Sequence, residues 1–394
     1  MKDRNHLANI GLVHQVSIIE NGLIDIPMLQ VLQPDGTLHP DAILSEMTQE
    51  KAHKILQTME YIRLLDERMV AAQRQGRISF YLACTGEEAS TVASAAALEP
   101  QDMIMSQYRE QGALAYRGFS TKEFMDQMFS NQDELNKGRQ MPIHYGSKAL
   151  NFMTISSPLG TQIPQASGYA YGQKMAGLDA ITICYFGEGA ASEGDFHAGL
   201  NMAAVLNCPA IFFCRNNGYA ISTPSEEQFK GDGIASRGLG YGIRTIRVDG
   251  NDVLAVYTAT QKAREIAVAQ QCPVLIEAMT YRLAAHSTSD DPTSYRSKDE
   301  EQGWQLKDPV MRFKTWMQSK GWFDEKQNQS FKEQSRQDIL QALKVAEQVP
   351  ICPVDEIIQD VYDTPPWHLK AQLEELKTHI GKYPDAYPKT SGRL

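Results

Sequence analysis

Two loops of this 394-residue chain carry side chains that can hold a metal ion beside a phosphate. Glu188 stands between Gly187 and Gly189 directly after the apolar run ITICYF, and Asn217 follows a second apolar run, AIFFC. A carboxylate, an amide oxygen and the carbonyls of the turn from Asn217 to Tyr219 are hard oxygen donors suited to Mg²⁺. This ion keeps few protein ligands and commonly shares phosphate oxygens.

The residues after Glu188 favour an anion. The small residues Gly189, Ala190 and Ala191 let a diphosphate approach the backbone at a helix N-terminus, where free N–H groups attract negative charge. Arg215, at the end of the second apolar run, is placed to add a positive charge to the same phosphates. We therefore expect one site for Mg²⁺ and a diphosphate.

A βαβ unit must position these loops. Residues 181–186 and 210–214 are short apolar runs without polar alternation, which is typical of strands buried on both faces of a parallel sheet. Residues 193–207 carry an apolar stripe at helical spacing, and Pro209 ends that helix. Both polar loops then lie at the carboxyl ends of strands, where open α/β sheets bind ligands.

The surrounding sequence extends this argument to a family. YFGEGAASEGDFHAGLN together with FFCRNNGYAISTP resembles the thiamine-diphosphate motif, with Glu188 where the family usually has Asp. More widely, the chain is similar to the alpha subunits of the branched-chain 2-oxo acid dehydrogenases. A Rossmann dinucleotide site is the alternative. It is disfavoured because Ser192 replaces the third glycine and no acidic residue stands about twenty residues after the loop.

The resemblance implies thiamine diphosphate, Mg²⁺ and K⁺ as ligands of this chain. The residues implied to contact the cofactor are Tyr108, Arg109, Ser157, Leu159, Gly187, Glu188, Gly189, Ala190, Arg215, Asn217, Tyr219 and His286. Of these, Glu188, Asn217 and Tyr219 are implied to hold Mg²⁺, and Gln107 and Tyr108 to lie near the substrate. The residues implied for K⁺ are Ser156, Pro158, Thr161 and Gln162. From chemistry alone, this group of hydroxyls and carbonyls at a helix start is better explained as a helix cap.

A polar segment, residues 281–300, follows a third apolar run and is expected to be a mobile surface loop. The resemblance makes His286 catalytic, in contact with the diphosphate, although a lone loop histidine is more often solvated. Relatives often carry a second histidine where this chain has Ala285. Ser287 and Ser297 match phosphorylated positions of mitochondrial relatives, and a phosphate on Ser287 would oppose the diphosphate. Unmodified serines are the simpler expectation.

The implied reaction is the oxidative decarboxylation of branched-chain 2-oxo acids such as 3-methyl-2-oxobutanoate, with transfer of the acyl group to a lipoyl arm. The cofactor supplies this chemistry and the protein orients it. A pyruvate-specific enzyme and a non-catalytic cofactor-binding subunit are the alternatives. In the family a glutamate from a second domain activates the cofactor, and this chain has no room for that domain. A beta subunit in an α₂β₂ assembly and a lipoyl-bearing acyltransferase core are therefore the expected partners.

The predicted fold class is α/β, with a doubly wound, mostly parallel sheet. We expect an N-terminal arm in residues 1–48, or equally a loose tail, then the cofactor-binding domain in residues 49–308 and a helical extension in residues 309–394. Residues 229–242 are glycine-rich and predict a loop. His144 lies in another loop and is expected to be structural more than catalytic.

The composition of the chain limits the classes of partner that it can bind and bears on its cellular compartment. A net charge of −10 argues against nucleic acid, and no apolar stretch has the length of a membrane span. The six cysteines contain no C-x-x-C pair, which favours free thiols over disulfides or a zinc site. The first residues, MKDRNHLANIG, resemble neither a secretory signal nor a transit peptide, so a full-length chain with this start is expected to be cytoplasmic.

Overall fold

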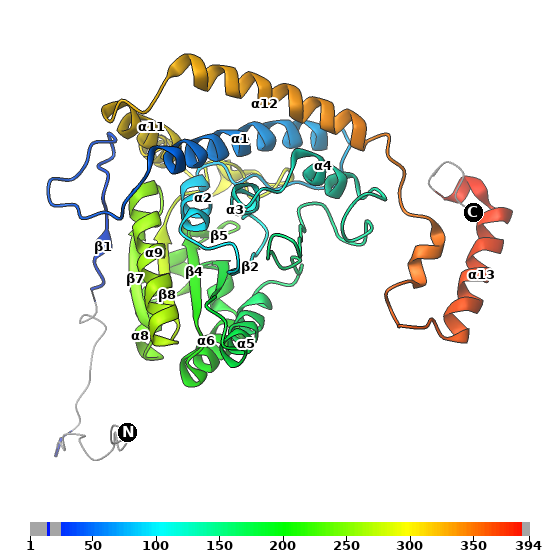
Figure 1. Ribbon diagram of the computed structural model, residues 1–394, viewed down its shortest axis with the longest axis horizontal. Helices are drawn as coiled ribbons and strands as arrows, with labels where there is room; N and C mark the ends of the chain where they lie inside the picture. Colours follow the sequence, from blue (N-terminus) through cyan, green and yellow to red (C-terminus); the bar gives the residue numbers. More distant parts are fainter. Residues whose placement is uncertain (1–13, 16–24, 388–394) are drawn as a thin grey trace.

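A parallel sheet organises the chain, of which the computed structural model describes residues 14–15 and 25–387 (Figure 1). Its strands pair in the order β1-β7-β8-β4-β3-β2, and each pairing is parallel. The strands are β1 (Met28–Leu29), β2 (Met103–Met105), β3 (Thr182–Gly187), β4 (Ala210–Asn216), β7 (Arg244–Asp249) and β8 (Val274–Met279). The predicted α/β class with a doubly wound sheet is confirmed.

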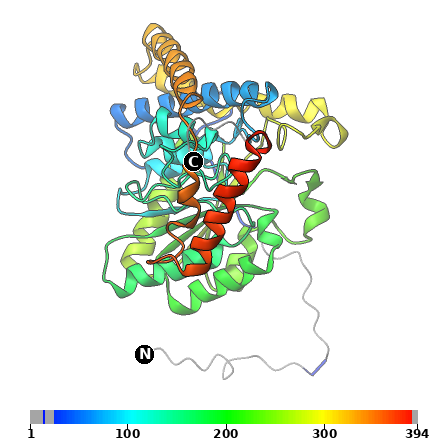
Figure 2. The same cartoon turned by 90° about the vertical axis from the view of Figure 1, so that its right-hand side faces the viewer.

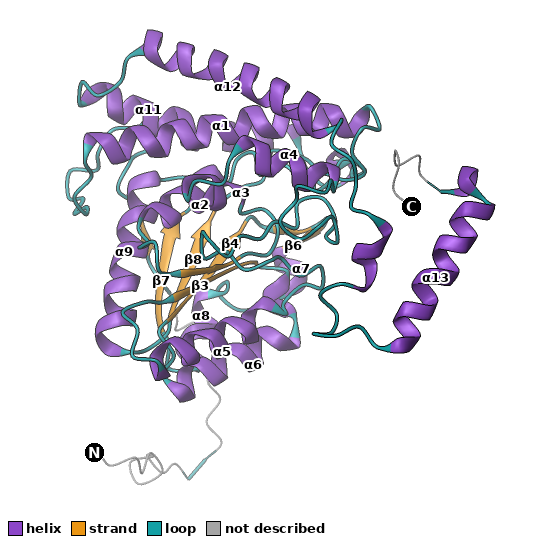
Figure 3. Cartoon of the chain, turned by 45° about the vertical axis from the view of Figure 1, so that its right-hand side comes forward, coloured by secondary structure: helices purple, strands orange, loops and turns teal. Residues whose placement is uncertain are grey.

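Side chains alternate between two cores, one on each face of the sheet. On β3, Ile183 and Tyr185 face one core, and Cys184 and Phe186 face the other. Helices cover both faces (Figure 3). The first face is covered by α1 (Gln49–Arg74), α2 (Glu88–Ala96) and α9 (Val253–Gln270), and the second by α5 (Gln162–Met175), α6 (Gly194–Leu206) and α8 (Ala235–Gly240).

Further helices form an outer layer on the first face of the sheet. The long helix α12 (Glu325–Ala346) lies along α1, and both pack against neighbouring helices (Figure 1). The neighbours are α3 (Gln111–Tyr116), α4 (Thr121–Phe129) and α11 (Pro309–Ser319). Ser120 and Glu123 form a capping box at the start of α4, because each side chain accepts from the other residue's backbone N–H.

Two predicted loops contain helix. Helix α8 lies inside the glycine-rich segment 229–242, so that prediction was wrong. The reason is Glu277 of β8, whose buried carboxylate accepts hydrogen bonds from the backbone N–H groups of Ile234 and Ala235 and so caps α8. The segment 281–300 is also more regular than predicted, since it contains the 3₁₀ turn η3 (Pro292–Ser294) and the start of α10 (Lys298–Gln305).

The described part of the predicted N-terminal arm packs against its own chain. Strand β1 extends the sheet beside β7, and the backbone N–H groups of Val31 and Leu32 both donate to Oδ2 of Asp252. Oδ1 of Asp252 caps α9 by accepting from Leu254 and Ala255. Most of the arm's first 24 residues lie outside the described part of the chain.

The final helix, α13 (Trp367–Lys382), stands away from the sheet (Figures 1 and 2). It packs against the short turn η4 (Val354–Ile358). Lys137 ties this region to the rest of the chain through Glu356 and Asp360. Across the described residues, no helix has the length and apolarity needed to cross a membrane.

The four hydrogen bonds on Asp252 predict a large stability effect. In Asp252→Asn an amide NH₂ replaces the oxygen that accepts from Val31 and Leu32, which leaves buried donors facing donors. We expect the free energy of unfolding to fall by about 1–3 kcal/mol, as is typical for a buried group left unsatisfied. Urea unfolding followed by tryptophan fluorescence measures it. Asp41→Asn is the control, because Asp41 is an exposed residue of the N-terminal arm that Asp252 binds. Equal stability of the two variants would contradict the role assigned to Asp252.

Candidate cofactor and active site

The two predicted metal loops meet at the carboxyl edge of the sheet. The backbone N–H of Asn217 donates to Oε2 of Glu188 at 3.3 Å, and Oδ1 of Asn217 accepts from the backbone N–H of Tyr219 at 3.2 Å. Gly189 must be a glycine here, because a Cβ on it would lie 2.7 Å from the Cβ of Ala220. Tyr219 and Ala220 form β5, which pairs with β6 (Thr223–Pro224) in the second loop.

Glu188 has the properties of a cation ligand. It is 1% exposed, and its Oε1 has no hydrogen-bond partner among the described residues. Burial, together with the nearby Glu87 carboxylate, raises the pKa of Glu188 to about 7. A divalent cation would supply the positively charged partner that this buried oxygen lacks. In the described part of the chain, no group of three or more His, Cys, Asp or Glu side chains could hold a metal by itself. A cation here therefore depends on few protein ligands, which suits Mg²⁺.

Three buried arginines near this edge lack carboxylate partners among the described residues. Arg109 donates to the carbonyls of Ala83 and His286. Arg282 donates to the carbonyls of Ala284 and Ile221 and to the hydroxyl of Tyr295. The guanidinium of Arg296 donates from Nη1 to the carbonyls of Arg282 and Ala284, while its Nε and Nη2 have no partner there. Buried arginines bonded only to neutral groups favour a bound anion.

Arg215, predicted to contact the diphosphate, is held by two buried carboxylates. Its Nη1 donates to Oε1 of Glu87 at 2.8 Å and its Nε to Oε1 of Glu110 at 2.6 Å. Burial alone lowers the pKa of Arg215, but the Glu110 and Glu87 carboxylates raise it above the ordinary value. Two carboxylates thus orient Arg215 at the end of β4, and its contact with a diphosphate stays a prediction.

His286 is placed beside the arginines, and its tautomer follows from them. Its Nδ1 lies 3.2 Å from Nη2 of Arg109 and 3.2 Å from Nη1 of Arg282. Since a guanidinium only donates, Nδ1 accepts and the proton of the neutral ring is on Nε2. Burial, followed by the charges of Arg109 and Arg282, lowers the pKa of His286 to about 4. At neutral pH the residue is therefore an uncharged N–H donor.

The residues predicted near the substrate support the end of β3. Oε1 of Gln107 accepts from the backbone N–H of Gly187 at 2.9 Å. The backbone N–H groups of Gln107 and Tyr108 both donate to Oε2 of Glu110, which fixes the turn after β2. The guanidinium of Arg109 lies 5.3 Å from the ring centre of Tyr108. Gln107 and Tyr108 thus border the metal loop and the arginines.

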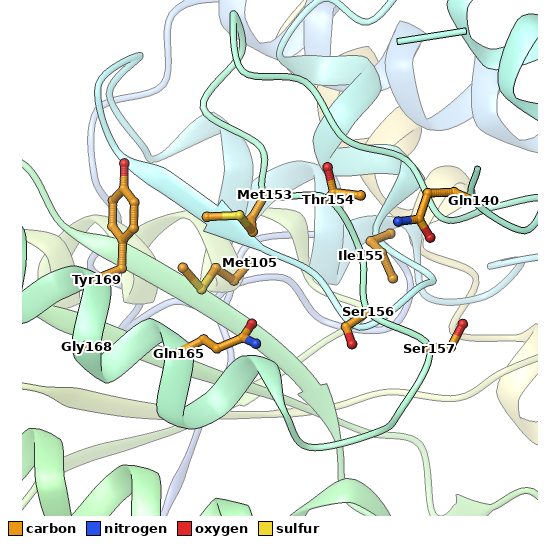
Figure 4. Close-up of a pocket in the computed structure, with 10 residues that line it drawn as sticks. All are labelled: Met105, Gln140, Met153, Thr154, Ile155, Ser156, Ser157, Gln165, Gly168 and Tyr169. Atoms are coloured by element: carbon orange, nitrogen blue, oxygen red, sulfur yellow. The ribbon is translucent and has the colours of Figure 1, made fainter. Parts of the chain in front are cut away.

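The predicted K⁺ segment lies beside an open cavity of about 580 Å³ (Figure 4). In the figure, Gln165 and Tyr169 of α5 lie across from Met153 and Thr154. Ser156 and Ser157 also line this cavity, while Leu159 is exposed in the same turn. The segment's contacts differ from a helix cap. Thr161 occupies the N-cap position of α5, but its hydroxyl donates back to the carbonyl of Pro158 at 3.0 Å, and Gln162 donates to the carbonyl of Tyr185.

His144 is fully satisfied, as expected of a structural histidine. Its Nδ1 donates to the carbonyl of Pro142 at 3.0 Å, and its Nε2 lies 2.8 Å from the hydroxyl of Ser157. The serines predicted as regulatory differ from one another. Ser287 follows His286 and is half-buried, whereas Ser297 is exposed and caps α10 by accepting from the N–H of Glu300.

Sequence reasoning missed several residues of this edge. Glu87 and Glu110 were not assigned roles, although they hold Arg215, and Arg282 and Arg296 were passed over within a polar segment. The only sequence signal for Arg282 and Arg296 was the presence of two arginines in the segment that also carries His286. Glu87 and Glu110 had no such signal, because Arg215, their shared partner, is 128 and 105 residues away in sequence.

Comparison with known proteins now adds to this geometry. The model of the dehydrogenase E1 component family matches residues 56–355. The 2-oxoisovalerate dehydrogenase alpha subunits of Homo sapiens and Arabidopsis thaliana (alpha 1) are each 49% identical over 383 residues. That match spans 97% of this chain and 86% and 81% of those proteins. The Caenorhabditis elegans alpha subunit is 49% identical over 365 residues, which is 92% of this chain and 84% of that protein.

This chain belongs to the dehydrogenase E1 component family, among the 2-oxoisovalerate dehydrogenase alpha subunits. The names of these relatives also correct one expectation. All three are mitochondrial proteins, so the prediction of a cytoplasmic location was wrong. That prediction rested only on the composition of a few N-terminal residues.

The lowered pKa of His286 predicts a pH dependence of stability. The unfolded chain binds a proton at this histidine as the pH falls through its ordinary pKa, about 6.5, whereas the folded chain does so only near 4. The free energy of unfolding should therefore fall between about pH 6.5 and pH 4 in the wild type. In His286→Gln this contribution is absent. Urea unfolding at pH 7.5, 6 and 5 measures the difference, and parallel pH profiles would show that His286 titrates normally.

Proposed function

We propose that this E1 alpha subunit carries out the oxidative decarboxylation of branched-chain 2-oxo acids with thiamine diphosphate and Mg²⁺. It would pass the acyl group to a lipoyl arm. The reaction is that of 3-methyl-2-oxobutanoate dehydrogenase (2-methylpropanoyl-transferring), another name for the activity in the relatives' printed names. The observation that carries the cofactor assignment is the unpaired Oε1 of buried Glu188 at the same sheet edge as three arginines without carboxylate partners. A cation and an anion are both needed to satisfy this edge.

The donor set suits magnesium diphosphate. Glu188, the side-chain oxygen of Asn217 and the carbonyl of Tyr219 would hold the cation, and Arg109 and Arg282 would hold the diphosphate. When bound, the cofactor supplies the carbanion chemistry that removes CO₂ from a 2-oxo acid. Gly189 and Ala190 leave the backbone accessible beside Glu188. Ser157 and Leu159 would approach the cofactor from the turn before α5.

His286 would act as the donor at the reacting end. Its Nδ1 is held by Arg109 and Arg282, so the Nε2–H group is free to give a hydrogen bond to the reacting group. A neutral ring is suited to this task because it adds no further positive charge to a pocket that already contains unpaired arginines. Ser156, Pro158, Thr161 and Gln162 are proposed to bind K⁺, which would order the turn that carries Ser157.

A beta subunit is proposed to complete the site in an α₂β₂ heterotetramer, and a lipoyl-bearing acyltransferase core to receive the product. Apolar side chains exposed on this chain support a partner surface. Met175 of α5 and Val205 of α6 are 67% and 70% exposed, and Trp367 at the start of α13 is 79% exposed. Isolated exposed apolar residues are ordinary, but α5 and α6 pack side by side and carry several.

Decarboxylation by the co-expressed alpha and beta chains tests this function. We expect 3-methyl-2-oxobutanoate to be preferred over pyruvate, with activity that requires both thiamine diphosphate and Mg²⁺. Glu188→Gln should reduce activity by at least about 100-fold at low Mg²⁺, because it removes the only charged cation ligand, worth about 3 kcal/mol or more. A preference for pyruvate would contradict the substrate assignment, and full activity of the chain alone would contradict the need for a beta subunit.

A further inference from the structure

Glu87 is a buried carboxylate that contacts both Asn217 of the cation loop and Arg215. The residue is 0% exposed and precedes α2, and its side chain does not cap that helix. Its Oε1 accepts from Nδ2 of Asn217 at 3.3 Å and from Nη1 of Arg215 at 2.8 Å. A single oxygen of Glu87 therefore contacts one proposed cation ligand, Asn217, and Arg215, both at the end of β4.

The contact with Asn217 decides which end of that amide faces the cation site. A carboxylate oxygen only accepts, so the NH₂ group of Asn217 must point toward Glu87. The amide oxygen, which also accepts from the N–H of Tyr219, then points the other way, as a cation ligand requires. Without Glu87, nothing among the described contacts of Nδ2 would favour this orientation over the flipped one.

The pairing with Arg215 does not by itself explain why a second carboxylate is present. Arg215 is already bonded to Oε1 of Glu110 at 2.6 Å, and one carboxylate is enough to neutralise one guanidinium. Burying another charged group is costly unless it gains further partners. The ion pair with Arg215 uses only Oε1 of Glu87, at 2.8 Å, and leaves its second oxygen without a partner among the described residues.

The other oxygen of Glu87 points to a ligand. Oε2 is buried and has no hydrogen-bond partner among the described residues, which is also true of Oε1 of Glu188. Native proteins rarely leave such atoms unsatisfied, and each orphan calls for a water, an ion or a ligand group. A hydrated Mg²⁺ keeps several waters, each of which is a hydrogen-bond donor. A carboxylate that cannot coordinate directly can still accept from one of them.

Resting on the proposed function, we propose that Glu87 is a positioning residue of the cation site. Oε1 fixes the amide of Asn217 with its oxygen toward the cation, and Oε2 accepts a hydrogen bond from a water of the hydrated cation. Glu87 thereby acts on the affinity for the metal without being one of its ligands.

Metal affinity of the assembled alpha and beta chains tests this role. Mn²⁺ replaces Mg²⁺ as the probe, and the free Mn²⁺ signal in electron paramagnetic resonance is followed during titration with thiamine diphosphate present. Glu87→Gln keeps an oxygen for Asn217 but removes the charge and presents NH₂ in place of the free oxygen. We expect its dissociation constant for Mn²⁺ to rise 10- to 100-fold, the usual effect of losing a partner that orients metal ligands.

The next residue provides a matched control. Glu88 is equally buried, but its carboxylate accepts from Nε of Arg63 at 2.7 Å and from the backbone N–H of Gly86, away from the cation loop. Glu88→Gln should lower the melting temperature and leave Mn²⁺ affinity within about 2-fold of wild type, because it touches no proposed ligand. If Glu87→Gln behaves like Glu88→Gln, Glu87 is structural and the inference is overturned.

Two further measurements keep the outcomes separate. If Glu87→Gln does not fold, Glu87→Asp keeps the charge but withdraws both oxygens by one methylene, and an unchanged Mn²⁺ dissociation constant in that variant also overturns the inference. If the wild-type assembly does not bind Mn²⁺ with thiamine diphosphate at all, it is the proposed function that fails. Both the proposed function and the inference are supported if the wild type binds Mn²⁺, Glu87→Gln binds it more weakly and Glu88→Gln binds it as the wild type does.

Discussion

The structure depends on charged side chains held out of water at the carboxyl edge of the sheet. Arg109, Arg215, Arg282 and Glu188 are each no more than 2% exposed, yet only Arg215 is paired with carboxylates. An unpaired buried charge costs several kcal/mol, so such a group persists only where a ligand of opposite charge completes it. The two layers of helices and the parallel strands fix the positions of these groups, so that a bound ligand can supply the charges of opposite sign.

The parallel topology explains why these groups meet. Strands β3, β4 and β8 run in one direction, so the loops that carry Glu188, Asn217 and Arg282 end at one edge although they are far apart in sequence. Alternating apolar side chains bury both faces of these strands, and the polar groups of the site follow the strand ends. The fold therefore brings these charged groups together at one edge, while other buried charges, such as Asp252 and Glu277, serve as helix caps elsewhere.

Local patterns were enough to predict the central unit from sequence, and long-range pairs were not. The ends of β3, α6 and β4 agree with prediction within two residues, because apolar runs and a helical stripe report local structure. The ion pairs of Arg215 were not predicted because its partners, Glu110 and Glu87, lie 105 and 128 residues away. Helix α8 was missed for the same reason, since its cap is a carboxylate on β8. Burial and tautomers, as at His286, follow only from such contacts.

The edge carries unsatisfied charges of both signs, which also bears on how a ligand binds. An anion alone would satisfy Arg109 and Arg282 but leave the buried oxygen of Glu188 unpaired, and a cation alone would do the reverse while facing unpaired arginines. A ligand that carries both charges relieves both costs in one event. Binding of the cation then raises the affinity for the anion, and binding of the anion raises the affinity for the cation, which is positive thermodynamic coupling. Magnesium diphosphate has this composition, whereas a neutral ligand, or a cation without phosphate, leaves part of the penalty in place.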